Sequence, residues 1–149
     1  ILFPEIEITI VDSLKKRIRF LEILVEELAL ENVHLVHARA EDFGQKDEFR
    51  SAFDVVTARA VARLSVLAEF CLPITKEKGI FAAMKGSQGA DELEDSKKAL
   101  KILGGRLQAI ETFELPEDAG ERSILLINKV KNTPKKYPRQ AGIPNKKPL

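Results

Sequence analysis

Charged side chains directly follow several short apolar runs of this sequence. Asp12 follows the β-branched run 6–11, and Arg59 follows the run 53–58. A carboxylate only accepts hydrogen bonds, so at the end of a strand it can hold two neighbouring ribose hydroxyls. An arginine in such a place can bind a carboxylate or a phosphate through two parallel hydrogen bonds. The alternatives are a helix N-terminal aspartate stabilised by the helix dipole and a surface salt bridge of little energetic value.

Two further short motifs occupy similar places. Ala40 and Glu41 follow the run 33–37 and could line an adenine pocket through a side-chain or backbone contact, although an ordinary solvated turn has the same composition. Lys85 and Gly86 follow the run 79–84, so a cation and a close backbone approach could meet a substrate phosphate there. A plain loop is the alternative interpretation of that segment.

The apolar pattern predicts the elements that must position these residues. Period-two or β-branched runs predict strands, and a 3.6-residue period predicts helices. In chain order we expect strands at 6–11, 33–37, 53–58 and 79–84 and helices at 13–30, 64–72 and 90–103, with Ser13 as a cap. Residues 106–115 and 123–130 have no helix between them and predict an antiparallel pair. The alternation predicts an α/β fold, a doubly wound and mostly parallel sheet whose ligands bind at the carboxyl ends of its strands.

Composition narrows the class of protein. The 149 residues are 44% hydrophobic and 32% charged, the balance of a single globular domain. The most apolar stretch, 53–72, is interrupted by charges, so we expect no membrane span, and we see no leader peptide. Cys71 is the only cysteine and is expected to be inert core packing in a reducing, cytoplasmic protein. His34 and His37 make no metal-ligand set with it, so we expect no metal.

Charge is distributed unevenly along the chain. Eight of the 24 Lys and Arg residues lie from Arg122 onward, whereas none of the 23 Asp and Glu residues does. Residues 132–149 contain four prolines, which predicts an extended tail after a domain spanning residues 1–131. A basic tail with one tyrosine can neutralise phosphates and stack on an unpaired base, or it can be a solubilising end. The sequence positions that we consider for RNA contact are Lys85, Arg122, Lys135, Lys136 and Arg139.

An ordered series of motifs gives the sequence a specific resemblance. The motifs are VDSLKKR at 11–17, RAEDF at 39–43, TARAVA at 57–62, MKG at 84–86, ER at 121–122 and NTPKKYPR at 132–139. Together they resemble the RsmG (GidB) family of bacterial guanine-N7 methyltransferases of small-subunit ribosomal RNA, in particular its Bacillus-like members. The resemblance implies a Rossmann-like class I methyltransferase fold, the cofactor S-adenosyl-L-methionine and ribosomal RNA as partner, with no membrane and a monomeric state.

The resemblance also implies roles for individual residues. Ala40 and Glu41 would contact the adenosine of the cofactor, Arg59 would belong to the cofactor site, and Asp12 would hold the ribose. We therefore expect Asp12, Glu41 and Arg59 to converge on one cleft. No residue is assigned to catalysis, because guanine N7 carries a free lone pair and needs no general base before attack.

The family pattern includes a part that this sequence lacks. Members carry a glycine-rich loop after a strand that precedes position 6, whereas the first glycine here is Gly44. We expect that strand and loop to belong to the natural protein, with the strand between those ending at Asp12 and Ala58. Without it, both strands would expose unpaired edges.

Three rival functions remain open on the sequence alone. One is a methyltransferase of the same fold acting on another substrate. A second is a nicotinamide-dependent oxidoreductase, which the antiparallel end of the sheet and the lack of a catalytic Tyr/Lys or His/Asp set disfavour. The third is a noncatalytic RNA-binding module, which would bind RNA and show no affinity for a cofactor.

Overall fold

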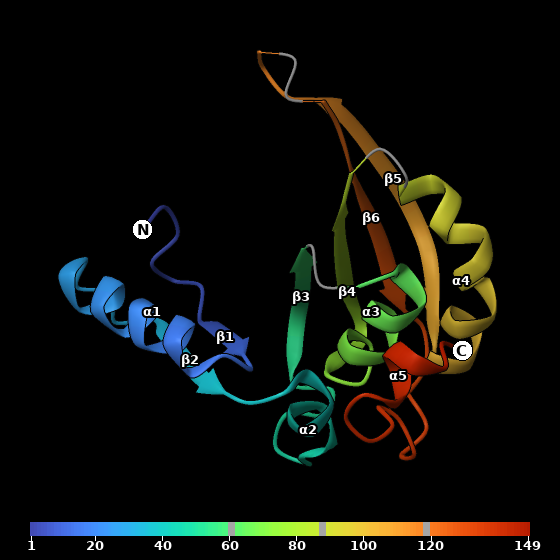
Figure 1. Ribbon diagram of the computed structural model, residues 1–149, viewed down its shortest axis with the longest axis horizontal. Coiled ribbons are helices and arrows are strands. Elements are labelled where there is room, and N and C mark those ends of the chain that lie inside the picture. Colours follow the sequence, from blue (N-terminus) through green and yellow to red (C-terminus); the bar gives the residue numbers. More distant parts are fainter. Residues whose placement is uncertain (60–61, 87–88, 118–119) are drawn as a thin grey trace.

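Strands and helices alternate through most of the chain in the computed structural model, which describes residues 1–59, 62–86, 89–117 and 120–149 (Figure 1). Positions 60–61 of the TARAVA motif and 87–88 lie outside this description. The elements are β1 (Ile8–Asp12), α1 (Lys15–Glu27), β2 (Val33–His37), α2 (Ala40–Gln45), β3 (Phe53–Arg59), α3 (Leu64–Cys71), β4 (Thr75–Lys85), α4 (Gly89–Leu103), β5 (Gly105–Glu114), β6 (Glu121–Lys129) and α5 (Ile143–Lys146). The predicted strands and helices are confirmed with small shifts at their ends, while α2 and α5 were not predicted.

The strands pair in two groups. β1 and β2 run parallel, from Ile8 opposite Val33 to Asp12 opposite His37. The second group has the order β3-β4-β6-β5, in which β3 and β4 are parallel and β6 is antiparallel to both β4 and β5. The predicted α/β fold with a C-terminal antiparallel strand pair is therefore confirmed.

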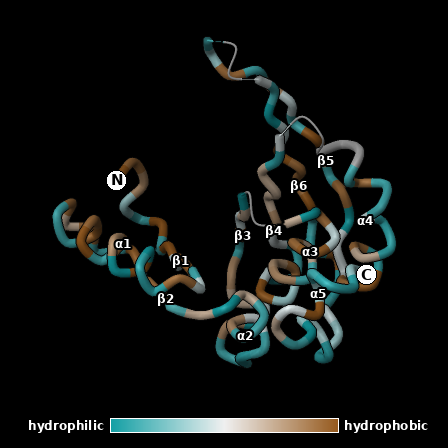
Figure 2. The backbone as a smooth tube through the Cα atoms, viewed as in Figure 1, coloured by the Kyte–Doolittle hydropathy of each residue, from teal (hydrophilic) through white to brown (hydrophobic). Residues whose placement is uncertain are grey.

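The division between the two groups falls between β1 and β3. Within the described residues each of these strands has one hydrogen-bonded neighbour, so each has an open edge. Apolar side chains beside the division are exposed, among them Ile8 at 41% and Val55 at 59%. On α1, Phe20, Ile23, Leu24 and Leu28 are also exposed, and Figure 2 shows the hydrophobic colouring of this N-terminal part. Open strand edges and exposed apolar faces are uncommon in folded proteins with a complete β-sheet, because they favour association with other chains.

The core is centred on α3. All eight of its residues are buried, including the polar Ser65 and Glu69. It packs with Phe81 and Ala83 of β4 and with Leu125 and Ile127 of β6. Cys71 is part of this cluster, as predicted, and its burial raises the pKa of the thiol to about 12.

The C-terminal segment 132–149 is folded, and the prediction of an extended tail is wrong. Thr133, Tyr137 and Pro144 are buried, and Tyr137 belongs to the core cluster around α3. The segment returns to lie against α2 and α3 and includes the short helix α5 (Figure 1). Proline spacing could not reveal the polar contacts that hold the segment against the domain.

A buried amine lies under this segment. Lys129 is 1% exposed, and its Nζ donates to the carbonyl oxygen of Leu72 and, at 2.6 Å, to Thr133 Oγ1. Burial lowers the pKa of Lys129 to about 8, and the positive charge of Arg50 adds to this effect. Lys129 is one of the eight basic residues from Arg122 onward, but its burial excludes it from contact with RNA phosphates.

We expect Lys129 to make the folding stability rise between pH 8 and 10.5. In that window the unfolded chain, whose lysine keeps its usual pKa of 10.5, binds a proton that the folded chain has released. Urea denaturation at about pH 7.5 and about pH 9.5 should show an extra gain on the order of 1–2 kcal/mol in the natural protein over Lys129→Met. The opposing contribution of Cys71 is present in both proteins and cancels. Equal pH dependence in the two proteins would contradict the assignment.

Candidate nucleoside and RNA site

Asp12 ends β1 and begins the turn into α1. Its Oδ1 accepts the backbone N–H of Leu14 at 2.7 Å, and its Oδ2 pairs with Arg17 Nη1 at 3.2 Å. The prediction that Ser13 caps α1 is wrong, since Leu14 is the N-cap residue and has no side-chain cap. The Asp12 side chain is 21% exposed, so part of its carboxylate still faces solvent at the end of the strand. It is thus both a turn residue and a possible acceptor for hydroxyl groups.

Ala40 and Glu41 form the first turn of α2, where a loop was predicted. Glu41 is buried at 6% exposure, and its Oε1 accepts the backbone N–H of Gly142 at 2.9 Å. The side chain is therefore committed to the C-terminal segment. A contact of this turn with a nucleoside would be made through its backbone.

Three predicted cationic positions share one end of the four-stranded sheet. Arg59, at the end of β3, is in register with Met84 of β4, and the next residue, Lys85, is in register with Ser123 of β6. Arg122 immediately precedes Ser123, so the three residues occupy neighbouring strands at the same rim. Arg59 is exposed, and Arg122 is partly exposed with one hydrogen bond to the carbonyl of Glu121. Parallel pairing of β3 and β4 brings these strand ends together, as the sequence predicted.

Lys85 differs from the other two because its ammonium group is used inside the protein. The side chain is 9% exposed, and Nζ lies 2.7 Å from Glu92 Oε2 and 2.6 Å from the carbonyl oxygen of Ala62. The same Glu92 oxygen accepts the N–H of Leu64, the first residue of α3. Lys85 therefore joins β4 to the starts of α3 and α4, and it could reach a phosphate only by leaving Glu92.

The predicted RNA-contacting residues of the C-terminal segment also differ in their exposure and their partners. Lys135 and Lys136 are exposed, and the Lys136 Nζ lies 5.2 Å from the centroid of the Tyr137 ring. Arg139 instead forms an ion pair with Glu69, its Nη2 lying 2.6 Å from Oε2. The hydrogen bonds to Glu69 raise the pKa of Arg139. Lys135 and Lys136 can meet solvent phosphates, while Arg139 is mainly an internal anchor.

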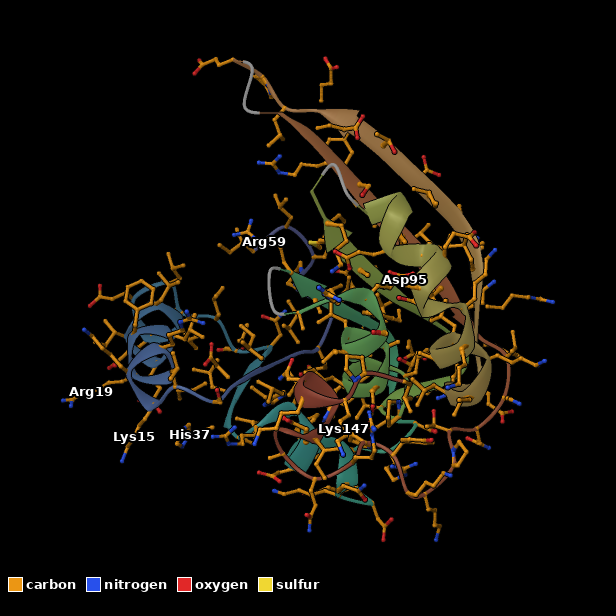
Figure 3. All side chains as sticks on the ribbon, turned by 45° about the vertical axis from the view of Figure 1, so that its right-hand side comes forward. Lys15, Arg19, His37, Arg59, Asp95 and Lys147 are labelled. Atoms are coloured by element: carbon orange, nitrogen blue, oxygen red, sulfur yellow. The ribbon has the colours of Figure 1, made fainter. Side chains whose placement is uncertain are left out.

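The structure does not bring Arg59 to Asp12, whereas β1, which ends at Asp12, contacts α2, which holds Glu41. Figure 3 shows Arg59 well apart from His37, which is the register partner of Asp12 on β2. Glu41 faces the C-terminal segment. The reason is the open division of the sheet: no hydrogen-bonded strand within the described residues links β1 to β3, so their ends are not aligned as they would be in one continuous sheet.

Other candidates for a ligand site lie elsewhere or are weak. A hollow beside α1 is lined by Lys15, Ile18, Arg19, Glu22 and His37, and another lies between α4 and β5. His34 pairs with Glu7 at 2.8 Å and His37 contacts the carbonyl of Ser13. In the part of the chain that the structure describes, no group of His, Cys, Asp and Glu side chains could hold a metal ion. Among the same residues no helix is long and apolar enough to cross a membrane.

Sequence reasoning missed Arg50, Glu69 and Glu92, although each organises part of the structure. The signal for Glu69 was present, since a single carboxylate in the otherwise apolar run 64–72 must find a cation when that run is buried. Nothing in the sequence marks Arg50, which donates to the carbonyl oxygens of Gly44, Thr133 and Tyr137.

Parallel strands with connecting helices, closed by an antiparallel last pair, define the fold of Rossmann-like S-adenosylmethionine-dependent methyltransferases. The protein YcgJ of Bacillus subtilis matches with a TM-score of 0.65 at 14% identity, over 85% of this chain and 83% of its own. Aeropyrum pernix fibrillarin, solved with natively bound S-adenosyl-L-methionine, matches with a TM-score of 0.61 at 11% identity, over 81% and 55%. At such identities the likeness establishes the fold.

Within that class, the chain belongs to the GidB family, described as rRNA small subunit methyltransferase G, whose family model matches residues 1–124. The resemblance noted in the sequence is thereby confirmed. Ribosomal RNA small subunit methyltransferase G of Oceanobacillus iheyensis is 58% identical over all 149 residues. The proteins of that name from Staphylococcus aureus and from a Geobacillus species are 58% and 57% identical over the same length.

The chain spans 62–63% of the length of these curated relatives. The division of the sheet between β1 and β3 is thus seen in a chain shorter than its relatives.

Arg50 generates a prediction about stability. We expect Arg50→Met to lower the free energy of unfolding by about 2–3 kcal/mol, because three carbonyl groups lose a charged donor. The matched substitution Arg106→Met, at an exposed position of β5, should change it by no more than about 0.5 kcal/mol. Urea denaturation of both variants measures the difference. Similar losses in the two variants would show that the contacts of Arg50 contribute little.

Proposed function

We propose that the protein is an S-adenosylmethionine-dependent methyltransferase that methylates N7 of a guanine in small-subunit ribosomal RNA. The observation that carries the proposal is the 58% identity, across all 149 residues, to proteins named ribosomal RNA small subunit methyltransferase G. We further propose that it acts as a monomer in the cytoplasm, where its RNA substrate is.

The chain contains part of a nucleoside site, and that part fits the cofactor. Asp12 offers a partly exposed carboxylate at the end of β1, suited to two ribose hydroxyls. The turn at Ala40 and Glu41 offers backbone groups for the adenine, and Arg59 offers a guanidinium for a carboxylate. The proposal includes a further strand between β1 and β3, which would pair both open edges and align the ends of β1 and β3 at one rim.

When bound, S-adenosylmethionine supplies an electrophilic methyl group on a sulfonium. Guanine N7 has a free lone pair, so this chain needs no side chain to remove a proton before the attack. Its residues then act by alignment and by shaping the local field. Asp12 orients the ribose, the first turn of α2 orients the base and Arg59 holds the carboxylate of the cofactor. Arg122, at the same rim as Arg59, is available for RNA contact.

The cations proposed for RNA contact are separated along the chain by most of β6. Arg122 lies near the start of β6, at the rim where β3 and β4 end, whereas Lys135 and Lys136 follow the far end of the strand in the sequence. Arg122 and Lys129, the last residue of β6, are seven residues apart, so about 23 Å of strand separates the rim from the start of the C-terminal segment. Arg122 would act near the methylated base, and Lys135 and Lys136 would contact phosphates away from it.

Two measurements on the full-length protein test the proposed function. Calorimetry with S-adenosylmethionine and with NAD should show binding of the first compound alone. Transfer of a tritiated methyl group to small-subunit ribosomal RNA should then follow, with the label at guanine N7. Binding of NAD in place of S-adenosylmethionine, or label recovered only in protein, would overturn the assignment, and RNA binding without either cofactor would favour a noncatalytic module.

The role of the C-terminal lysines generates a separate prediction. We expect the double variant Lys135→Gln/Lys136→Gln to bind RNA with a shallower salt dependence, the slope of log K against log salt falling by about 1.5, because two phosphate contacts are lost. Its affinity for S-adenosylmethionine should not change. Fluorescence anisotropy with small-subunit RNA at several salt concentrations measures the slope.

The matched control is Lys98→Gln/Lys101→Gln, which removes two exposed lysines from α4 and should leave the slope unaltered. An unaltered slope in the C-terminal variant would remove these lysines from the RNA interface. Deletion of residues 132–149 would not serve as a test, because Tyr137 of that segment is part of the core.

A further inference from the structure

Residues 137–142, which we call the strap, bind the buried helix α3 through one ion pair. The backbone N–H of Arg139 and its Nε both donate to Glu69 Oε1 at 2.8 Å, and Nη2 donates to Oε2 at 2.6 Å. Glu69 has no exposed surface, so its charge depends on these three donors. The strap is therefore fixed to the core at Arg139.

The strap also contacts both ends of α2. The N–H of Gly142 donates to Glu41 Oε1 at 2.9 Å in the first turn. Near the last turn, Gln45 Nε2 donates to the carbonyl oxygen of Pro138. Gly44 lies so close to the strap that a Cβ at this position would be 2.9 Å from Pro138 Cγ. Arg50 adds hydrogen bonds to the carbonyl oxygens of Gly44 and Tyr137, joining the two segments from the side.

α2 needs this support because it cannot stabilise itself. It has six residues, and its N-cap residue, Arg39, makes no side-chain hydrogen bond to the helix. Helices of this length are not stable on their own in water, so their position is set by what they pack against. The strap supplies a hydrogen bond at the first turn, another near the last turn, and a close packing contact at Gly44.

We propose that the strap positions the adenosine-binding turn of the cofactor site, with Arg139 and Gly142 as positioning residues that act through Glu41. The inference rests on the proposed function, because Ala40 and Glu41 have a ligand only if the protein binds S-adenosylmethionine. The Glu41 carboxylate is an anchor for the turn, and the backbone of Ala40 and Glu41 contacts the base. Fixing a contact turn in its bound geometry raises affinity by lowering the entropy lost on binding.

The test compares variants of the full-length protein by calorimetry with S-adenosylmethionine. Arg139→Gln should weaken binding roughly tenfold, and Arg139→Lys should restore part of the loss, since one charged donor to Glu69 remains. Glu41→Gln keeps an amide oxygen that accepts the N–H of Gly142, so it should weaken binding less than Arg139→Gln does. The matched control is Gln140→Ala, an exposed strap position, which should have no effect.

Gly142→Ala gives a second route if Arg139→Gln does not fold. Gly142 has a φ of +84°, and nothing lies within 4 Å of the added Cβ, so the change strains the backbone without a steric clash. We expect its affinity for S-adenosylmethionine to fall several-fold. Calorimetry is carried out at a temperature at which urea denaturation curves show that every variant is fully folded in the absence of urea.

A change in base selectivity separates positioning from a general loss of stability. S-adenosylhomocysteine is compared with its inosine counterpart, in which oxygen replaces the exocyclic amine. A misplaced turn should lower the preference for adenine, so the ratio of the two affinities should fall toward one in Arg139→Gln and Gly142→Ala. A merely destabilised protein would lose both affinities in proportion.

The outcomes distinguish this inference from the function on which it rests. If the natural protein binds no S-adenosylmethionine, the proposed function fails and the inference falls with it. If the natural protein binds and the strap variants keep both its affinity and its selectivity, only the inference is overturned. A proportional loss of both affinities also overturns it, and a loss of more than tenfold in Glu41→Gln would show that the carboxylate itself contacts the nucleoside.

Discussion

A carboxylate with no exposed surface, Glu69, lies in the most apolar helix of the protein and requires a cation. Arg139 meets that requirement from 70 residues further along the chain. This ion pair joins α3 in the core to the C-terminal segment, which it holds against α2. Removing Arg139 would leave the buried carboxylate of Glu69 without a cation, at a cost that greatly exceeds the net value of the pair. Glu41 and Arg50 contact the same anchored segment, at Gly142 and Tyr137 respectively, and Lys129 contacts its start at Thr133.

Sequence patterns predicted the elements that depend on local periodicity. The β-branched runs at 33–37 and 53–58 and the apolar helix at 64–72 form where expected, because each run matches the period of its element. The antiparallel end of the sheet was predicted from the missing helix between its last two strands. Parallel pairing of β3 with β4 places Arg59 and Lys85 at one rim, and antiparallel pairing of β4 with β6 adds Arg122, so their positions depend on the topology and not on side-chain contacts.

Side-chain partners that are distant in sequence were not predictable. Lys85 and Arg139 are residue types that bind phosphates, but in the structure they form ion pairs with Glu92 and Glu69. The expected meeting of Asp12 with Arg59 failed for a different reason, since two strand ends share a rim only when a continuous ladder of hydrogen bonds connects them. The proline content of residues 132–149 suggested an extended segment. The contacts that fold it back include hydrogen bonds from Arg50 to backbone carbonyl groups, which every sequence has and which composition therefore cannot reveal.

The separation of the exposed cations along β6 constrains the shape of any RNA that touches both groups. A single looped-out nucleotide can contact Arg122 at the rim, but about 23 Å of strand separates Arg122 from Lys129, after which Lys135 and Lys136 follow in the sequence. Simultaneous engagement of both groups requires a folded RNA in which the target base and the anchoring phosphates belong to different parts of the fold. Recognition through two separated groups of cations would depend on the tertiary shape of the RNA as much as on the bases around the target.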